Sequence, residues 1–281
     1  MRMILLLCAL LVTGYVLLIC IYLILAGIPA IREVGLRDFL LGTVWTPTHR
    51  NTPKFGILPM ILASLYGTIA SIMIGVPVGI LTALYLSKFA APRTAALLRP
   101  MIHLLAGIPS VVYGLIGMLV LVPALRNAFD LPAGDSLLAA IIVLAAMILP
   151  SVISLSDTAL SAVPREYEEG SLALGATETE TYFHISLKSA RSGLAAAVVL
   201  GIGRAIGETM AIVMVAGNVA NMPSLLKSVR FLTTGIAIEM NYATAGSLQR
   251  NALFSIGLVL FVFMLVINII LQLIMRKGGK H

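Results

Sequence analysis

Long runs of uncharged, apolar residues constrain the fold of this chain more than any other feature. The first run, Met3 to Ala30, contains no charged residue. It is too long for the apolar core of a secretory signal, about 7–15 residues, and no small-residue cleavage motif follows it. A helix that crosses a membrane needs about 20 mostly apolar residues. We therefore expect this run to be a first spanning helix that is retained in the protein.

Six segments are long and apolar enough to span a membrane, and the residues between them carry nearly all the charge. Charged residues make up 11% of the chain, less than half of the roughly 25% that is usual in soluble domains. The sequence therefore predicts an all-α polytopic membrane protein with six transmembrane helices in one domain over residues 1–281. The predicted spans are Ile4–Ala26, Leu58–Leu86, Pro100–Val122, Leu137–Leu155, Gly193–Gly217 and Leu253–Met275.

An even number of spans would place both termini on the same side of the membrane. Lys and Arg are slightly more numerous on that side, and the tail after Met275 is strongly basic. Cytoplasmic flanks of spanning helices carry an excess of Lys and Arg. We therefore expect cytoplasmic termini, with the long connections 31–55 and 218–249 outside. The second of these contains an amphipathic stretch, 225–240, that could re-enter the membrane or lie on its surface.

The net charge of +7 does not indicate nucleic-acid binding, because no basic stripe alternates with aromatic residues. The four histidines and two cysteines have no metal-ligand spacing. The sequence also contains no Walker A, dinucleotide-binding or hydrolase motif. We therefore expect no nucleic-acid partner, no metal or cofactor held by this chain and no catalytic residues.

The most polar connection on the inner side, Asp157–Arg191, predicts two helices joined by a turn, which we call the elbow. Glutamates follow Pro164, where a helix N-terminus favours negative charge. Gly175 is typical of a helix C-terminus, and Thr177 to Glu180 has the pattern of a capping box that opens a second helix. The elbow could dock on a soluble partner or rest against the protein's own helices, and the residues alone favour neither.

The elbow resembles the EAA loop of ABC importer permeases, whose pattern is Glu-Ala-Ala, three residues, Gly, nine residues and Ile-x-Leu-Pro. Lys188 stands where that family usually has proline. The resemblance implies a type I, MetI-like permease fold with a coupling helix in the loop 157–191. It also implies a separate ATPase that binds ATP and magnesium and is contacted by the elbow. The residues that match the pattern are Glu169, Gly170, Ser171, Gly175, Ile185 and Leu187.

Arg204 and Glu208 are the only charged residues within the six predicted spans. Four residues apart in a helix, they would project from one face, and charges in spans normally face the bundle interior or an aqueous path. They could form a structural ion pair, or Arg204 could bind an oxyanion through its forked donors while Glu208 moderates the attraction. Thr209 would add a hydroxyl, and Gly203 and Gly207 would leave space.

Two longer segments, Leu104–Gly114 and Gly203–Asn218, resemble the phosphate-importer permeases PstC and PstA, and the part after Glu208 is nearer to PstC. The likeness covers about residues 55–275. In that family an Arg and a Glu of this span are associated with phosphate passage, and they correspond here to Arg204 and Glu208. The resemblance implies a bacterial inner membrane and three partners: a PstA-like second permease, a dimer of a PstB-like ATPase and a PstS-like phosphate-binding protein outside.

Other functions remain open from the sequence. The cargo could be another oxyanion, such as molybdate, tungstate or sulfate. The chain could also be a secondary transporter, a channel or a membrane-embedded sensor that transports nothing. The elbow argues against a secondary transporter or channel, because neither requires a docking site for an ATPase. A sensor would require the Arg204→Gln and Glu208→Gln variants to keep full uptake and to alter signalling only.

Overall fold

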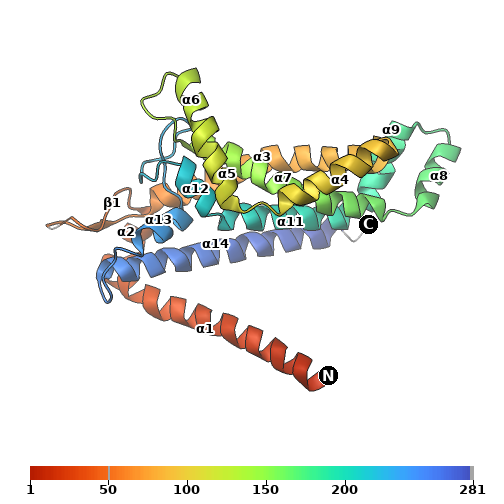
Figure 1. The fold of residues 1–281 in the computed structure, drawn as a ribbon. Coiled ribbons are helices and arrows are strands. Elements are labelled where there is room, and N and C mark those ends of the chain that lie inside the picture. The colour runs from red at the N-terminus through yellow and green to blue at the C-terminus, as the bar shows by residue number, and fades with distance from the viewer. Residues whose placement is uncertain (50, 279–281) are drawn as a thin grey trace.

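The computed structural model describes residues 1–49 and 51–278. In Figure 1, α3 (Leu58–Leu84), α7 (Leu137–Ser161) and α14 (Leu248–Gly278) run along a common direction. Helix α1 diverges from them toward its N-terminus, and the helix from α5 to α6 crosses their direction steeply. The last three residues of the predicted basic tail, 279–281, lie outside the described residues. Among the described residues, five helices are long and apolar enough to span a membrane: α1 (Arg2–Val34), α3 with its π-helical end (Leu58–Phe89), α5 to α6 (Ser110–Ala128), α7 (Leu137–Ser161) and α14 (Leu248–Gly278).

A sixth candidate span is bent. It joins the second arm of the elbow, Glu178–Ser189, to α11 (Arg191–Gly207) at an angle of 71°. Within the described residues the only sheet is a pair of two-residue antiparallel strands, β1 (Trp45–Thr46) and β2 (Lys54–Phe55). The prediction of an all-α polytopic membrane fold is therefore confirmed. The remaining helices are α2 (Leu36–Leu41), α4 (Pro92–Ala106), α8 (Arg165–Ala173), α9 (Glu178–Thr181), α10 (Leu187–Ser189), α12 (Met210–Val215) and α13 (Leu232–Glu239).

The third predicted span, Pro100–Val122, is wrong as a single helix. The chain leaves helical geometry between α4 and α5, at Gly107 to Pro109. Proline has no N–H to continue the helical ladder, and it disfavours helical geometry in the residue before it. The spanning helix therefore begins at Ser110, and α4 forms a separate arm beside α7.

Helix α7 lies at the centre of the bundle and packs along α3, α11 and α4. Of its most apolar window 67% is buried, a larger share than in any other candidate span among the described residues. Gly75 and Gly79 of α3 make this contact possible, because a Cβ at either position would lie within 3 Å of Ile148 or Val152 on α7. Small residues at such positions let spanning helices approach closely.

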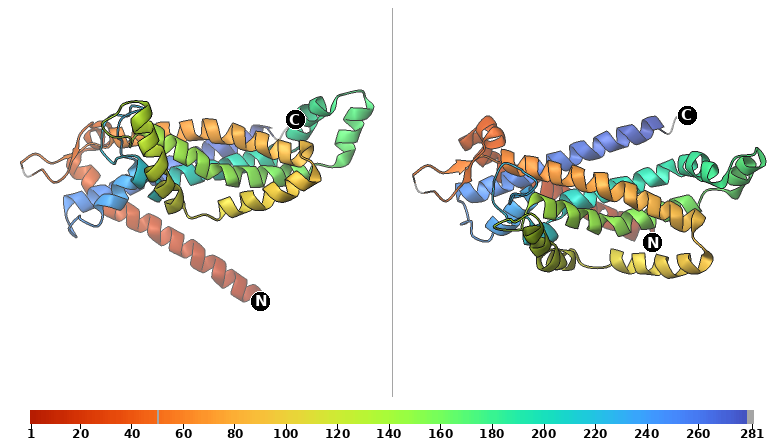
Figure 2. Two further views of the ribbon diagram at one scale, coloured as in Figure 1. Left: turned by 45° about the horizontal axis from the view of Figure 1, so that its top comes forward. Right: turned by 90° about the horizontal axis from the view of Figure 1, so that it is seen from above.

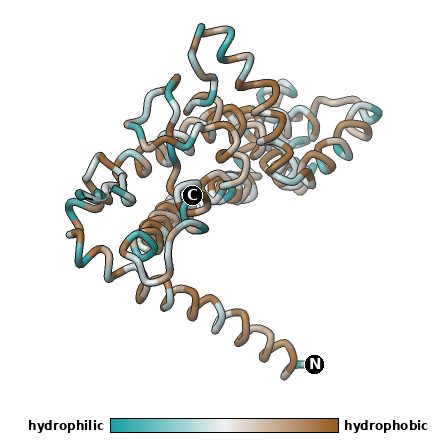
Figure 3. Tube along the Cα trace, turned by 60° about the vertical axis from the view of Figure 1, so that its left-hand side comes forward, coloured by the Kyte–Doolittle hydropathy of each residue, from teal (hydrophilic) through white to brown (hydrophobic). Residues whose placement is uncertain are grey.

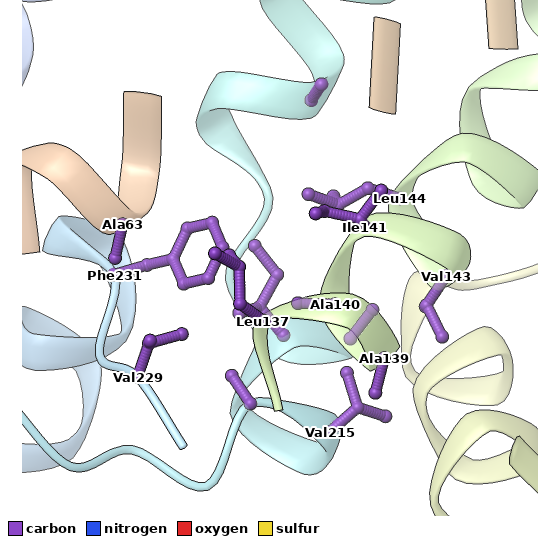
Figure 4. Close-up of a cluster of buried hydrophobic side chains, with 14 of the residues drawn as sticks. Ala63, Leu137, Ala139, Ala140, Ile141, Val143, Leu144, Val215, Val229 and Phe231 are labelled. Atoms are coloured by element: carbon purple, nitrogen blue, oxygen red, sulfur yellow. The ribbon is translucent and has the colours of Figure 1, made fainter. Parts of the chain in front are cut away.

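One half of the core is an apolar cluster where α7 begins (Figure 4). Leu137, Ala140 and Leu144 lie there with Phe231, which fills the space beside Gly67 of α3. A second cluster, which we call the inner cluster, joins the ends of α3 and α7 to the start of α11. It includes Leu84 and Leu160. Both clusters depend on α7, which fixes the positions of the helices around it.

The two ends of the molecule differ. The strands, α2 and α13 lie at one end, and α8 and α9 of the elbow lie at the other (Figures 1 and 2). The N-terminal end of α1 and the last described turns of α14 point toward the elbow. Hydrophobic residues follow the long helices, and hydrophilic ones occur mainly in the connections (Figure 3). We call the elbow end the inner end and the opposite one the outer end.

The amphipathic stretch 225–240 begins exposed, with Leu225 57% exposed, and then enters the bundle. Its helical part is α13, whose first four residues, Leu232–Gly235, are buried. The backbone N–H of Leu232 donates a hydrogen bond to Ser64 Oγ of α3 at 2.9 Å. The outer connection is thereby folded into the bundle.

Candidate functional site

The fifth predicted span, Gly193–Gly217, is interrupted near the middle of the bundle. Helix α11 ends at Gly207, Glu208 is extended (φ −69°, ψ 132°), and α12 begins at Met210. An unwound segment at membrane depth needs partners for its freed backbone groups. The Thr233 hydroxyl donates to the carbonyl oxygen of Glu208 at 2.9 Å. Glu208 Oε1 accepts from the backbone N–H of Ala211 at 3.0 Å and so caps α12.

This break overturns the predicted geometry of Arg204 and Glu208. Because the helix ends between them, they do not share a helical face. Arg204 Nη1 instead donates to the Ser151 hydroxyl of α7. No ion pair between Arg204 and Glu208 is found in the part of the chain that the structure describes. The interpretation as a structural ion pair is therefore wrong, and the guanidinium retains donors for another partner.

The space expected beside Arg204 is present. A Cβ built at Gly203 or at Gly207 would meet no atom within 4 Å. Arg204 itself is half-buried. Thr209, also half-buried, lies in the break, where its hydroxyl donates to the Gly207 carbonyl at 3.4 Å. The structure thus places Arg204, Glu208 and Thr209 around one interruption of a span, next to open space.

Sequence reasoning missed Ser151 and Thr233, which hold this site from neighbouring elements. Neither residue belongs to a motif, and each contact depends on packing between distant segments. One signal was available for Ser151, since it follows Pro150 in a span that is otherwise almost wholly apolar. A hydroxyl next to a helix proline often satisfies freed backbone groups, but here it receives the guanidinium.

The elbow forms the two predicted helices. Helix α8 ends at Ala173, and Gly175 then adopts a left-handed conformation (φ +90°) that favours glycine. The predicted capping box opens α9: Thr177 Oγ1 accepts from the N–H of Glu180 at 3.3 Å, and Glu180 Oε2 accepts from the N–H of Thr177 at 2.9 Å. Both local predictions are confirmed.

The residues that match the EAA pattern divide between two surfaces of the elbow. Glu169, Gly170 and Gly175 are exposed, and Ser171 is half-buried, with its hydroxyl 2.9 Å from that of Thr181. The half-buried Ile185 and Leu187 lie on the second arm, where Leu187 packs against the inner cluster. Lys188, in place of the usual proline, is exposed and stays within helix α10, and the bend follows at Ala190.

Glu168, one residue before the predicted motif, holds the elbow to the bundle. Its Oε1 lies 2.5 Å from Lys88 Nζ at the end of α3 and accepts from Ser186 Oγ at 2.7 Å. The side chains of Lys88 and Glu168 are only 11% and 14% exposed. Beside them, Phe89 packs edge-to-face on Tyr182 at 5.1 Å. Charge alone could not identify this residue, because the sequence offers three glutamates in this helix.

Large apolar side chains on and just after α8 are uncovered. Leu174 is 91% exposed, and Tyr167 and Leu172 are exposed as well. No residue of α8 is buried in the described chain. Large apolar side chains gathered on an otherwise polar helix are typical of a docking surface. The elbow therefore has one face fixed to the bundle and one face available to a partner.

The capping box makes the elbow sensitive to acid. Hydrogen bonds from the backbone and side chain of Thr177 hold the pKa of Glu180 below its usual value of 4.5. The ionised carboxylate therefore stabilises the box above that pH, and this stabilisation is lost as pH falls through the lower folded-state pKa. We expect faster deuterium exchange at Thr179–Thr181, corrected for intrinsic rates, below about pH 4. Glu180→Gln should remove this pH dependence. If the corrected exchange of the unsubstituted chain were the same at low pH as at higher pH, the prediction would be contradicted.

A polar cluster at the outer end joins the two long outer connections. Glu239 of α13 pairs with Arg230 and accepts from Trp45 Nε1 at 2.8 Å. Arg230 Nε also donates to the carbonyl of Asn218 at 2.7 Å. The cluster borders a cavity of about 650 Å³ together with Thr46 to His49 and Tyr242. The connections 31–55 and 218–249 therefore form one outer surface.

Comparison with known proteins gives three consistent results. The family model described as "Binding-protein-dependent transport system inner membrane component" matches residues 75–277. The probable ABC transporter permease protein YqgH of Bacillus subtilis is 41% identical over 274 residues, covering 95% of this chain and 88% of its own. The phosphate transport system permease protein PstC of Haemophilus influenzae is 33% identical over 279 residues, covering 92% and 87%.

Solved structures agree with the fold. An inward-facing conformation of the MetNI methionine ABC transporter contains a chain that superposes with a TM-score of 0.59 at 20% identity. The match covers 80% of this chain and 95% of that one. The expected MetI-like arrangement of helices is therefore confirmed. At this level of identity the likeness concerns the fold alone.

Proposed function

The chain belongs to the family of binding-protein-dependent transport system inner membrane components and is a permease subunit of an ABC importer; we propose that its cargo is inorganic phosphate. The interrupted span at Arg204 carries this proposal. A guanidinium with free donors, a hydroxyl partner and open space beside it fits a tetrahedral oxyanion. The similarity to PstC proteins, 33% identical in Haemophilus influenzae, supports phosphate among the oxyanions.

The site combines attraction with release. Arg204 offers charge-assisted hydrogen bonds, which are stronger than neutral ones. Glu208 lies four residues on, with one oxygen engaged at the α12 N-terminus. A fixed negative charge near the cation weakens the hold on an anion, and transport requires binding that is weak enough to let the cargo leave. Glu208 and Thr209 therefore adjust how tightly the site at Arg204 binds an anion.

A second permease completes the path. Helix α1 is apolar along its length, yet none of its most apolar window is buried in this chain. It packs on α14 only toward its C-terminal end and diverges from the bundle beyond that point (Figure 2). Part of this exposed surface of α1 faces lipid, and part suits the helices of a PstA-like permease.

The two ends of the chain have different partners. The exposed face of α8 docks on a PstB-like ATPase, which binds ATP and magnesium and performs the hydrolysis. The outer surface of the connections 31–55 and 218–249 receives a PstS-like phosphate-binding protein. Since the ends of α1 and α14 lie on the side of the elbow, the termini are cytoplasmic in this arrangement.

Transport by the assembled complex in proteoliposomes tests the cargo. We expect ATP-dependent uptake of radiolabelled phosphate from its binding protein. Arsenate, which has nearly the same shape and protonation, should compete, whereas molybdate, tungstate and sulfate should not. Uptake that is blocked by tungstate and unaffected by arsenate would overturn phosphate as the cargo and favour a different oxyanion. Uptake by this chain alone, without ATP, would favour a secondary transporter.

A further inference from the structure

The inner half of α7 carries a row of polar side chains, of which only Ser151 belongs to the site described above. Ser151, Ser154 and Asp157 follow one another at intervals of three residues. Each meets an arginine or histidine side chain of another helix. Ser151 accepts from Arg204 of α11, Ser154 Oγ lies 3.3 Å from His103 Nδ1, and Asp157 pairs with Arg99. Three consecutive contacts thus form one line from Arg204 toward the inner end.

The contact between Arg99 and Asp157 has the form of an oxyanion complex. Arg99 Nε donates to Asp157 Oδ2 at 2.9 Å, and Arg99 Nη2 donates to Oδ1 at 3.1 Å. A carboxylate occupies both prongs of the guanidinium, which is the geometry that also recognises phosphate. The Asp157 side chain is 14% exposed and that of Arg99 is 40% exposed, so this chain does not enclose the guanidinium.

The position of these groups does not fit purely structural packing. On its other face α7 packs on α3 through apolar groups, with Ile148 and Val152 against glycines. His103 is instead exposed, and Ser154 is only partly covered. Polar side chains inside a span normally face a bundle interior or an aqueous path.

We infer that this line, Ser151, Ser154 and Asp157 with Arg204, His103 and Arg99, is the inner leg of the anion path. The inference rests on the proposed function. Along a helix three residues advance about 4.5 Å. An anion leaving Arg204 therefore reaches Ser154 and His103 about 4.5 Å further in, and the Arg99 fork about 9 Å further in. There Asp157 competes for the guanidinium and returns the anion to water.

Chemical access to α7 tests the inference. Cys8 and Cys20, both on α1, are replaced with alanine, and Ser154→Cys is introduced. The assembled complex is treated in proteoliposomes with a negatively charged methanethiosulfonate, and modification of this chain is read by mass spectrometry. We expect Ser154→Cys to be modified, and phosphate loaded on the inner side to slow the reaction severalfold. Sulfate at equal ionic strength should not slow it.

Ser156→Cys is the matched control, because Ser156 lies two residues further on the same helix and is fully buried. It should stay unmodified. If the complex with Ser154→Cys does not assemble, His103→Cys on α4 tests access to the same contact between Ser154 and His103. The cysteine-free parent chain must first be shown to take up phosphate. Given that, the inference would be overturned if Ser154→Cys were not modified, or if phosphate did not slow its modification. A parent that takes up another oxyanion but no phosphate would instead refute the proposed function.

Discussion

Replacing Arg204 with glutamine should abolish phosphate uptake while the complex remains assembled. The side chain supplies the charge and the forked donors at the interruption of the span, and Ser151 alone cannot hold an anion. A hydrogen bond to a charged group contributes about 1.5–3 kcal/mol, and each 1.4 kcal/mol is about a tenfold change in affinity. Loss of two such bonds to one anion lowers binding at the site by at least about a hundredfold on the same scale.

Two further substitutions separate charge from geometry. Arg204→Lys keeps the charge but loses the planar fork, so we expect weak residual uptake. Arg126→Gln removes the same charge from an exposed position on α6 and should leave uptake unchanged. Initial rates of labelled phosphate uptake check all three variants, with co-purification of the ATPase as the measure of assembly. Full uptake by Arg204→Gln, or a complex that falls apart, would refute the role of Arg204 in the path.

Replacing Glu208 with glutamine should have a different effect from replacing Arg204 with glutamine. Its side chain caps α12 through the N–H of Ala211. Glutamine can still accept that hydrogen bond but no longer carries a charge. The contrast with Arg204 arises from the break at residue 208, because a continuous helix would have made the two side chains neighbours.

Local patterns in the sequence predicted local structure well. The capping box at Thr177 and the glycine terminus at Gly175 are found as expected, because each depends on residues within one turn. The spans were found from hydropathy, since the length of an apolar run is a local property. The interruption at Glu208 was not predicted. Neither glycine nor proline marks that exact residue, and Thr233, which accommodates the break, lies in a distant connection.

Contacts between segments were beyond sequence reasoning for the same reason. The motif directed attention to Glu169, but the adjacent Glu168 is the residue that contacts the bundle. A shift of one position rotates a side chain by about 100° around a helix of 3.6 residues per turn. Which glutamate faces inward is decided by how α8 packs, and no feature of the sequence shows that.

Reversing the charge of Lys88 should uncouple ATP hydrolysis from uptake. Lys88 and Glu168 join the end of α3 to the elbow, and both are largely buried. Lys88→Glu places two carboxylates together there. Loss of a fully buried ion pair costs about 3–5 kcal/mol, and we expect a smaller effect, about 1–3 kcal/mol, because this pair keeps some contact with solvent. The elbow then separates from α3, while its exposed apolar side chains, Leu172 and Leu174, stay in place.

The measurement is the ratio of phosphate transported to ATP hydrolysed by the reconstituted complex. We expect Lys88→Glu to keep the ATPase bound and active but to lower this ratio about tenfold, which corresponds to about 1.4 kcal/mol. Exchanging the two charges, Lys88→Glu with Glu168→Lys, should restore much of the ratio. Lys188→Glu, a reversal at an exposed site of the same elbow, should leave it unchanged.

Glu169→Lys distinguishes the two faces of the elbow. Glu169 is exposed beside the docking surface, so its reversal should weaken binding of the ATPase itself. Lys88→Glu should leave that binding intact, because it changes the contact between Glu168 and the end of α3 and leaves the exposed side chains of the elbow in place. If Lys88→Glu released the ATPase, or kept the normal transport ratio, the ion pair would not transmit motion from the elbow to α3. The different outcomes expected for neighbouring glutamates follow directly from the way α8 packs against Lys88 and Ser186.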